Sequence, residues 1–370
     1  SHTSTAANLT FSTGANIGAD SDGAEGESLA TVTLSATNST IDLGDGQSIF
    51  LDSVTDSTTD LTSTWTITTA TSGTVNVGTI DNTYGITTID ASSNDGTAMS
   101  IDAITTASVG SITLGGSGTF NIGDITTTAS GNTTIEAGNA SGTVTLDLGS
   151  VGGTGATVNL GTGAGTITTV DGTGQSTTIT LGSGNEVTDQ IVTSTTVGAV
   201  TIKNFEYSAA DDAIDISNSG WEAVSTNSGT NTITMLDGAA VTTDAIVLQT
   251  TSSSSKLDVD TGTGNVLIVD GDFATTTLVE DALETGGDCA ITLGASSADE
   301  TVTDWVIAWD DGTSTYIGVG AIEANSADTS TESDDGATIT TIEITTIVTI
   351  EGFSDVTNLV AANFGTNFIA

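Results

Sequence analysis

Short runs in which threonine, valine, isoleucine or leucine alternate with small polar residues follow one another through the first half of the chain. They include "TVNVGTI" (74–80), "GSITLGG" (110–116), "GTVTLDLGS" (142–150) and "TTITLGSG" (177–184). A period of two residues, bounded by glycine and asparagine, predicts short β-strands. Helix-like spacing of apolar residues occurs in one short piece, "TTLVEDALETGG" (276–287), which predicts a helix there.

The predicted strands recur at regular intervals of 8 to 13 residues, with a mean of about 12. The apolar residues that close the runs are Val77, Ile89, Ile101, Leu114, Ile122, Ile135, Leu148, Leu160, Val170 and Leu181. Such a repeat favours an all-β fold in which coils stack to form the core: an irregular right-handed parallel β-helix or β-solenoid, β-roll-like, with flanking β-sandwich-like segments. The alternative is a plain β-sandwich.

Three regions follow from this pattern. We expect an N-terminal β segment at 1–70, solenoid repeats at 71–202 and a C-terminal β domain at 203–370. If one coil takes two of the 12-residue units, residues 74 to 184 make between four and five coils.

Charge narrows the possible partners. The 370 residues include 47 Asp and Glu against two Lys and Arg, a formal net charge of −45. Such a polyanion repels nucleic acids and anionic membrane surfaces, so neither is expected as a partner. A hydrophobic content of 36% indicates a chain that folds, and no apolar run is long enough for a membrane span. The single cysteine, Cys289, excludes an intrachain disulfide and is expected to be buried.

The excess of acid makes cations the expected ligands. Carboxylates on adjacent coils, about 5 Å apart, repel by about 0.8 kcal/mol per pair even in water. Calcium suits sites made of carboxylate, amide and backbone oxygens in glycine-rich turns, although each acidic cluster alone also fits a solvated turn. The calcium candidates are Asp20, Asp22 and Glu25 in "GADSDGAEGE", Asp42 and Asp45 in "DLGDG", Asn185 and Asp189 in "SGNEVTD", Asp270 and Asp272 in "VDGD", and Asp310 and Asp311 in "WDDG".

Residues 181–217, "LGSGNEVTDQIVTSTTVGAVTIKNFEYSAADDAIDIS", resemble the end of a calcium-binding repeats-in-toxin (RTX) array. The matching positions are Ile202, Phe205, Asp212, Ile214, Asp215, Ile216 and Ser217. Residues 278–364, from "LVEDALETGG" to "VAANF", look like the C-terminal region of secreted RTX-type surface-layer (S-layer) proteins of Gram-negative bacteria. The family's consensus repeat "GGxGxDxUx" is nowhere intact.

This resemblance implies a C-terminal RTX-like domain with an assembly and secretion region. It implies type I secretion, folding that depends on Ca²⁺, and Asp212 and Asp215 as further calcium ligands.

The sequence therefore predicts a non-enzymatic structural protein, secreted and located at the cell surface. With His2 as the only histidine, neither a zinc-protease helix motif nor a Ser-His-Asp triad can form within the chain; glycoside hydrolysis by two carboxylates stays open on composition alone. We expect calcium-dependent self-assembly into a homo-oligomeric lattice or filament, with cell-surface polysaccharide as a further partner. The alternative is a secreted adhesin or ligand-binding module, including an ice-binding face made of threonines.

Overall fold

A computed structural model gives the structure of the protein. It describes residues 2–4, 8–11, 30–34, 38–43, 49–56, 64–69, 74–94, 98–127, 133–149, 155–169, 176–182, 189–193, 199–207, 212–216, 246–257, 264–293, 303–324 and 337–365. The chain forms two compact units, Ser1–Asp189 and Gln190–Ala370, called here the N-terminal and C-terminal units. Strands dominate both, as the alternating pattern predicts.

The N-terminal unit consists of strands joined by turns. They are β1 (His2–Ser4), β2 (Asn8–Phe11), β3 (Ala30–Leu34), β4 (Asn38–Leu43), β5 (Ile49–Asp56), β6 (Thr64–Thr69), β7 (Val75–Ala91), β8 (Ala98–Gly116), β9 (Thr119–Ile122), β10 (Ile125–Thr127), β11 (Thr133–Ala140), β12 (Val144–Leu148), β13 (Ala156–Leu160), β14 (Gly165–Thr169) and β15 (Ser176–Thr180).

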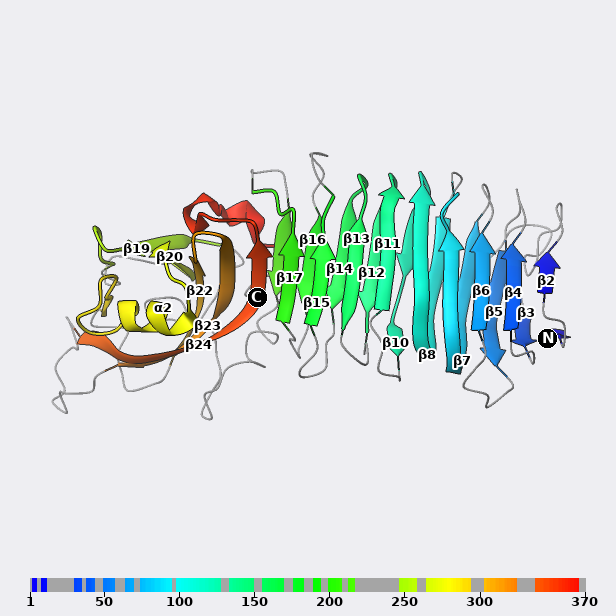
Figure 1. Cartoon of the computed structure of the whole chain (residues 1–370), viewed down its shortest axis with the longest axis horizontal. Helices are drawn as coiled ribbons and strands as arrows, with labels where there is room; N and C mark the ends of the chain where they lie inside the picture. Colours follow the sequence, from blue (N-terminus) through cyan, green and yellow to red (C-terminus); the bar gives the residue numbers. More distant parts are fainter. Residues whose placement is uncertain are drawn as a thin grey trace. The chain divides into compact units, whose positions relative to one another are not determined.

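These strands form two parallel ladders, because each coil contributes one strand to each. The first ladder runs through β1, β3, β5, the first part of β7, the first part of β8, β9, β12 and β14. The second runs through β2, β4, β6, the second parts of β7 and β8, β11, β13 and β15. Successive coils stand side by side from the blue to the green part of Figure 1, and the predicted β-solenoid is confirmed.

The length of one coil follows from the register. Val75 pairs with Met99, Met99 with Phe120, Phe120 with Val144, and Val144 with Gly165, which are steps of 24, 21, 24 and 21 residues. One coil therefore takes two of the units of about 12 residues seen in the sequence. The described strands before residue 71 pair in the same parallel ladders as those that follow.

The core of the N-terminal unit is a set of stacked apolar columns between the two ladders. Column residues are at most 3% exposed. The first ladder contributes Val77, Ile101, Ile122, Leu146 and Ile167, and the second contributes Ile89, Ile112, Ile135, Val158 and Ile179. Because no single coil encloses these side chains, each is buried by the coils above and below it.

The C-terminal unit combines parallel and antiparallel pairing. Its elements are β16 (Gln190–Thr193), β17 (Ala199–Lys203), β18 (Ala213–Ile216), β19 (Leu248–Ser252), β20 (Val266–Asp272), α2 (Thr276–Leu283), β21 (Thr292–Leu293), β22 (Thr303–Asp310), β23 (Ser314–Ala324), β24 (Ala337–Glu351) and two 3₁₀ turns, η2 (Val356–Asn358) and η3 (Ala361–Asn363). β19, β20 and β22 are parallel, β22, β23 and β24 are antiparallel, and β24 continues in parallel to β17. β16 and β18 also pair in parallel, and β21 pairs antiparallel with β24.

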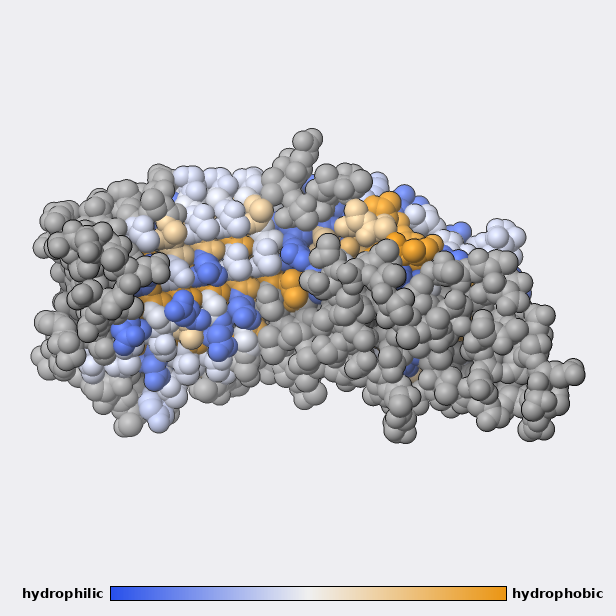
Figure 2. All heavy atoms as spheres, turned by 180° about the vertical axis from the view of Figure 1, so that it is seen from behind, coloured by the Kyte–Doolittle hydropathy of each residue, from blue (hydrophilic) through white to orange (hydrophobic). Residues whose placement is uncertain are grey.

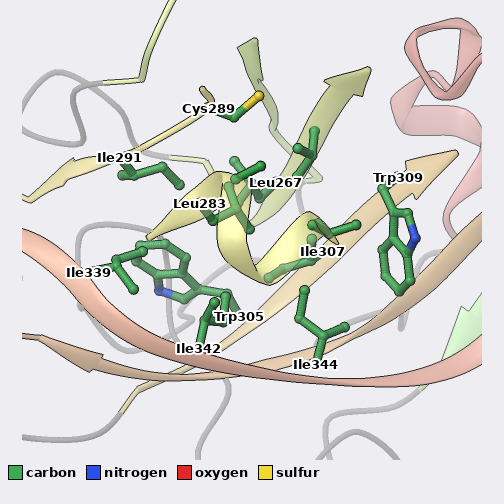
Figure 3. Packing of buried hydrophobic residues seen from close by; sticks show 13 residues of the cluster. Leu267, Leu283, Cys289, Ile291, Trp305, Ile307, Trp309, Ile339, Ile342 and Ile344 are labelled. Carbon is green, nitrogen blue, oxygen red and sulfur yellow. The ribbon is translucent and has the colours of Figure 1, made fainter. Parts of the chain in front are cut away.

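Helix α2 is the helix predicted from "TTLVEDALETGG". The Thr275 side chain caps it by accepting a hydrogen bond from Leu278 N. Figure 3 shows Leu283 of α2 facing Trp305 and Ile307 of β22, within a buried cluster that includes Cys289. Trp305 and Trp309 are 1% exposed, so the aromatic residues of β22 are part of the hydrophobic core.

Candidate functional site

The second ladder of the N-terminal unit presents a continuous column of small hydroxyl side chains on its outward side. The register aligns Thr66 with Thr88, Thr88 with Ser111, and Thr134 with Thr157 and Thr178. Because Ile112 pairs with Ile135, the residues just before them, Ser111 and Thr134, also align and continue the column. All six side chains are half-buried. This hydroxyl column repeats at the coil spacing of about 4.8 Å.

A second column lies two residues further along each strand, on the same face. From Asp42 to Glu136 it carries an acid on every second coil, and its full order is Asp42, Thr68, Asp90, Thr113, Glu136, Asn159 and Thr180. In this acid column the carboxylates of Asp90 and Glu136 are exposed. Asn159 Nδ2 donates to Oε1 and to Oε2 of Glu136 at 2.9 Å each.

The first ladder carries its acids on the alternate coils. Asp52, Asp102 and Asp147 follow the inward residues Leu51, Ile101 and Leu146, and glycines occupy the coils between them. A Cβ on Gly78 would meet Asp52 O, and one on Gly123 would lie 2.6 Å from Asp102 O, which places these glycines directly against the acids. The acids of this column are therefore staggered, with a glycine on the coil between each two of them.

This spacing changes the electrostatic problem posed by the sequence. Among the described N-terminal strands, no aligned pair of residues joins two acids. Doubling the separation from about 4.8 to about 9.6 Å halves the repulsion in water, from about 0.9 to about 0.4 kcal/mol. With screening at a Debye length of about 8 Å, the repulsion at the shorter separation is roughly four times that at the longer one. The columns themselves thus remove much of the need for cations between coils.

Figure 2 shows one side of the molecule, on which described side chains of similar hydropathy form rows along the stacked coils. Pale and blue polar rows alternate with narrow orange apolar bands. A regular polar surface of this kind offers repeated contacts to a partner that has a matching repeat.

Asp147 and Asp124 are two acids that lie near each other although they are not aligned partners in a ladder. Burial, followed by the nearby Asp124 charge, raises the pKa of Asp147. Asp147 Oδ1 is buried and accepts no hydrogen bond from the described residues. Asp124 has a positive φ of 34°, which is uncommon for residues other than glycine.

Three predicted calcium ligands are buried and bonded to the protein. Asp189, fully buried, accepts from Gly165 N at 2.7 Å and Gly182 N at 3.3 Å. Asp212 and Asp215, each 2% exposed, accept from Glu206 N at 2.8 Å and from Gln190 Nε2 at 3.0 Å respectively. These bonds hold turns and neighbouring strands together, which is a structural role whether or not a cation is also bound.

The described residues that resemble the end of an RTX array lie in or beside β17 and β18, and some contact the end of the described chain. Ile202, Phe205 and Ile214 are buried, and β18 lies beside β16. The end of the described chain returns to β18, where Gly365 N donates to Ile214 O at 2.6 Å and Asn363 Nδ2 donates to Asp212 O at 3.0 Å. The residues that carry the resemblance therefore shape this part of the C-terminal unit.

The acids of "VDGD" and "WDDG" meet in the C-terminal unit. Asp272 pairs with Asp310 across a bulge between β20 and β22, and among the described strands it is the one aligned pair of acids. Asp310 is 4% exposed and accepts from Gly312 N at 2.9 Å and Val356 N at 3.0 Å. Asp270, exposed, lies opposite Ser252.

The two neighbouring aspartates of "WDDG" have opposite electrostatic environments. Burial, with the Asp272 carboxylate close by, raises the pKa of Asp310 against the lowering effect of its two backbone hydrogen bonds. Burial also acts to raise the pKa of Asp311, but hydrogen bonds from the Tyr316 hydroxyl at 2.7 Å and from backbone amides lower it overall. Tyr316 in turn stacks on Trp309, with ring centroids 5.5 Å apart.

Replacing Asp272 with asparagine is expected to stabilise the C-terminal unit in EDTA at pH 7. The raised pKa of Asp310 means that ionising this group costs stability as pH rises above its unfolded value of 3.8, and removing the Asp272 charge relieves part of that cost. The gain is about 1 kcal/mol, a rise in Tm of roughly 2–4 °C, and it diminishes at low pH as Asp310 becomes protonated.

Thermal melts followed by circular dichroism measure this shift, with Asp270→Asn as a control of equal charge change. An unchanged Tm for Asp272→Asn at pH 7 contradicts the expected repulsion. A lower Tm for the same variant only in calcium identifies the pair as a calcium ligand.

The other calcium candidates are placed as follows. Asp20, Asp22, Glu25, Asp45 and Asn185 lie outside the described residues, and for Asp42 the structure gives the backbone register in β4. Among the residues that the structure describes, no three His, Cys, Asp or Glu side chains group closely enough to hold a metal ion. The described part of the chain also contains no helix long and apolar enough to cross a membrane.

Sequence reasoning selected Asp42 of the acid column together with acids that cluster in turns, and it missed most of the acids that align across coils. Asp90, Glu136, Asp102 and Asp147 are isolated in sequence, but the register brings them into columns. The sequence pattern that could have revealed them is an acid at the same outward strand position on every second coil. This pattern can be recognised once the length of a coil is known.

Comparison with known protein families, with curated proteins and with solved structures finds no match to this chain.

Proposed function

We propose that the protein is a secreted structural subunit that assembles with copies of itself at the cell surface, as a lattice or a filament. The observation that carries this proposal is the regular outward surface of the solenoid, with its hydroxyl column and acid column in register over successive coils. A surface that repeats every coil makes many equivalent weak contacts with another repeating surface, which is what assembly requires.

Calcium is the proposed link between copies. A net charge of −45 makes copies repel, and divalent ions bound by exposed carboxylates reduce that repulsion. The exposed acids Asp90 and Glu136 offer carboxylates to such ions, and Asp272 aligns with Asp310 between described strands. Staggered acids weaken the case for calcium between coils and strengthen the case for calcium between molecules.

Export by a type I secretion apparatus and membership of the RTX-type surface-layer proteins remain part of the proposal. They rest on the resemblance at 181–217 and at 278–364. A non-catalytic role rests on the inventory of side chains, because His2 is the only histidine in the chain.

The hydroxyl column favours a second candidate, a ligand-binding face. Thr66, Thr88, Ser111, Thr134, Thr157 and Thr178 repeat at a fixed spacing and are partly exposed. Such a row suits an ordered ligand, either the surface of ice or a polysaccharide chain. Measurement of thermal hysteresis and of polysaccharide binding tests this candidate, and activity by a monomer that does not assemble favours it over the first.

Calcium titration of the purified chain tests the first candidate. We expect monomers in EDTA to form ordered assemblies in millimolar calcium, followed by sedimentation velocity and negative-stain microscopy. Sodium chloride at the same ionic strength separates specific ion binding from screening, since screening alone acts equally in both salts. A chain that stays monomeric in calcium and in salt at all concentrations contradicts the proposal.

A further inference from the structure

Helix α2 covers part of one edge of strand β24. β23 pairs with β24 along the opposite edge, and β17 pairs with the final part of the edge that α2 covers. Before that point the edge lies against the helix instead of a strand. Glu280 Oε1 accepts a hydrogen bond from Ile344 N at 2.8 Å, and Glu284 Oε1 accepts one from Ile342 N at 3.3 Å. The helix therefore supplies acceptors where a neighbouring strand would supply carbonyl groups.

The spacing of the two glutamates matches the spacing of the strand amides. Residues four apart on a helix are separated by about 6 Å along its axis, and residues two apart on a strand by about 6.8 Å. Thr285, which follows the helix, adds a donor, since its N and Oγ1 donate to Ile339 O at 2.8 and 2.9 Å. Three backbone groups of β24 are thus bonded as a paired strand would bond them.

Helix α2 is too short to hold this position by itself. Its eight residues are fewer than an isolated helix needs in water. Its buried side chains, Val279, Ala282 and Leu283, pack in the same cluster as Ile342 and Ile344, and Figure 3 shows Leu283 on the helix and both isoleucines on the strand beside it. Removing the glutamate acceptors leaves two part-buried amides without these bonds, a cost that falls on the closed position of the helix and favours its opening.

An uncovered strand edge pairs readily with another strand, because its amides and carbonyls have no partner. Backbone pairing of this kind depends little on sequence. A second copy of the chain presents the same edge of β24, and two such edges can pair antiparallel about a two-fold axis, each satisfying the other.

We propose that α2, through Glu280 and Glu284, shields the edge of β24 and prevents the chain from pairing there with a second copy. The inference goes beyond the proposed self-assembly, because it concerns a contact that the closed helix blocks. Its test therefore uses EDTA, in which the proposed function expects monomers.

Two double variants test the shielding. Glu280→Ala with Glu284→Ala removes both acceptors, and Glu280→Gln with Glu284→Gln removes the same two charges but keeps an acceptor oxygen on each side chain. Alanine also has the higher helix propensity, so a weaker hold of the helix in the alanine variant does not come from propensity. We expect amide hydrogen exchange at Ile342 and Ile344 to speed up by about tenfold or more in the alanine variant, and by less than about threefold in the glutamine variant. The hydrogen-bonded amide of Phe120 in the N-terminal unit is the reference.

Sedimentation velocity in EDTA, with sodium chloride at about 0.5 M to screen repulsion between copies, measures the pairing. We expect the alanine variant to form dimers and the wild-type and glutamine chains to stay monomeric under these conditions. Exchange at Ile342 and Ile344 then slows again as the concentration of the alanine variant rises, because the second copy covers both amides. Circular dichroism checks that each variant is folded. The single variants Glu280→Ala and Glu280→Gln, at the shorter of the two bonds, replace a double variant that fails to fold.

Equal exchange rates in all three chains overturn the shielding role of the glutamates. Faster exchange without dimers, or dimers in which Ile342 and Ile344 still exchange fast, overturns pairing through β24. A wild-type chain that stays monomeric in calcium overturns the proposed function instead and leaves this inference standing.

Discussion

Replacing Ile112 with alanine is expected to lower the free energy of unfolding of the N-terminal unit by about 2–5 kcal/mol. Ile112 is 1% exposed and lies between Ile89 and Ile135 in the second-ladder column. Its removal leaves a cavity that neither neighbour can fill, since the hydrogen bonds of the ladder fix the spacing of the coils. Denaturant unfolding followed by circular dichroism measures the change.

Ile86→Ala is the matched control, because Ile86 lies on β7 and is 38% exposed. We expect it to cost less than about 1 kcal/mol, since a partly exposed side chain loses less burial and leaves no closed cavity. Equal costs for the two variants would show that the column does not carry the stability of the unit.

Replacing Gly142 with alanine is expected to destabilise the same unit by about 3 kcal/mol, at the upper end of the range for overpacking. A Cβ at Gly142 would overlap Gly118 O and lie 2.6 Å from Ser117 O on the preceding coil. Gly163 stands in the same relation to Gly142 on the following coil. These glycines allow the backbones of successive coils to approach at one corner, and a methyl group forces them apart.

Gly138→Ala is the control, for which we expect no destabilisation, in contrast to Gly142→Ala. A Cβ at Gly138 has no described atom within 4 Å. We therefore expect alanine to be neutral or to stabilise the unit by up to about 1 kcal/mol, because it lowers the conformational entropy of the unfolded chain. Thermal unfolding of both variants gives the comparison. If Gly142→Ala is as stable as Gly138→Ala, close approach at the corner is not what requires glycine.

Hydrophobic spacing was enough to predict the solenoid, because each closing apolar residue had to be buried by its neighbours. Val77, Ile101, Ile122, Ile135 and Leu148 are all at most 3% exposed. The coil of 21 to 24 residues agrees with two units of about 12. The buried Cys289 and helix α2 were also predicted correctly.

The candidate site was harder to predict because it depends on register. Turn lengths decide which outward residue of one coil lies over which residue of the next, and the sequence does not state that alignment. Asp90 and Glu136 are 46 positions apart in the chain, yet they lie in one column with Thr113 between them. Asp189 was chosen from an acidic cluster, and Asp212 and Asp215 from the RTX resemblance, whereas the hydrogen bonds that they accept became visible only with the fold.

The staggered acids give the stack a repeat that is twice as long as its backbone repeat. A single coil could be duplicated or lost without breaking the parallel ladders, but the change would interrupt the alternation, so that two acids or two neutral residues become neighbours in each column. Coils gained or lost in pairs keep the alternation intact. The charge pattern therefore sets the step by which a chain of this design can lengthen or shorten during evolution.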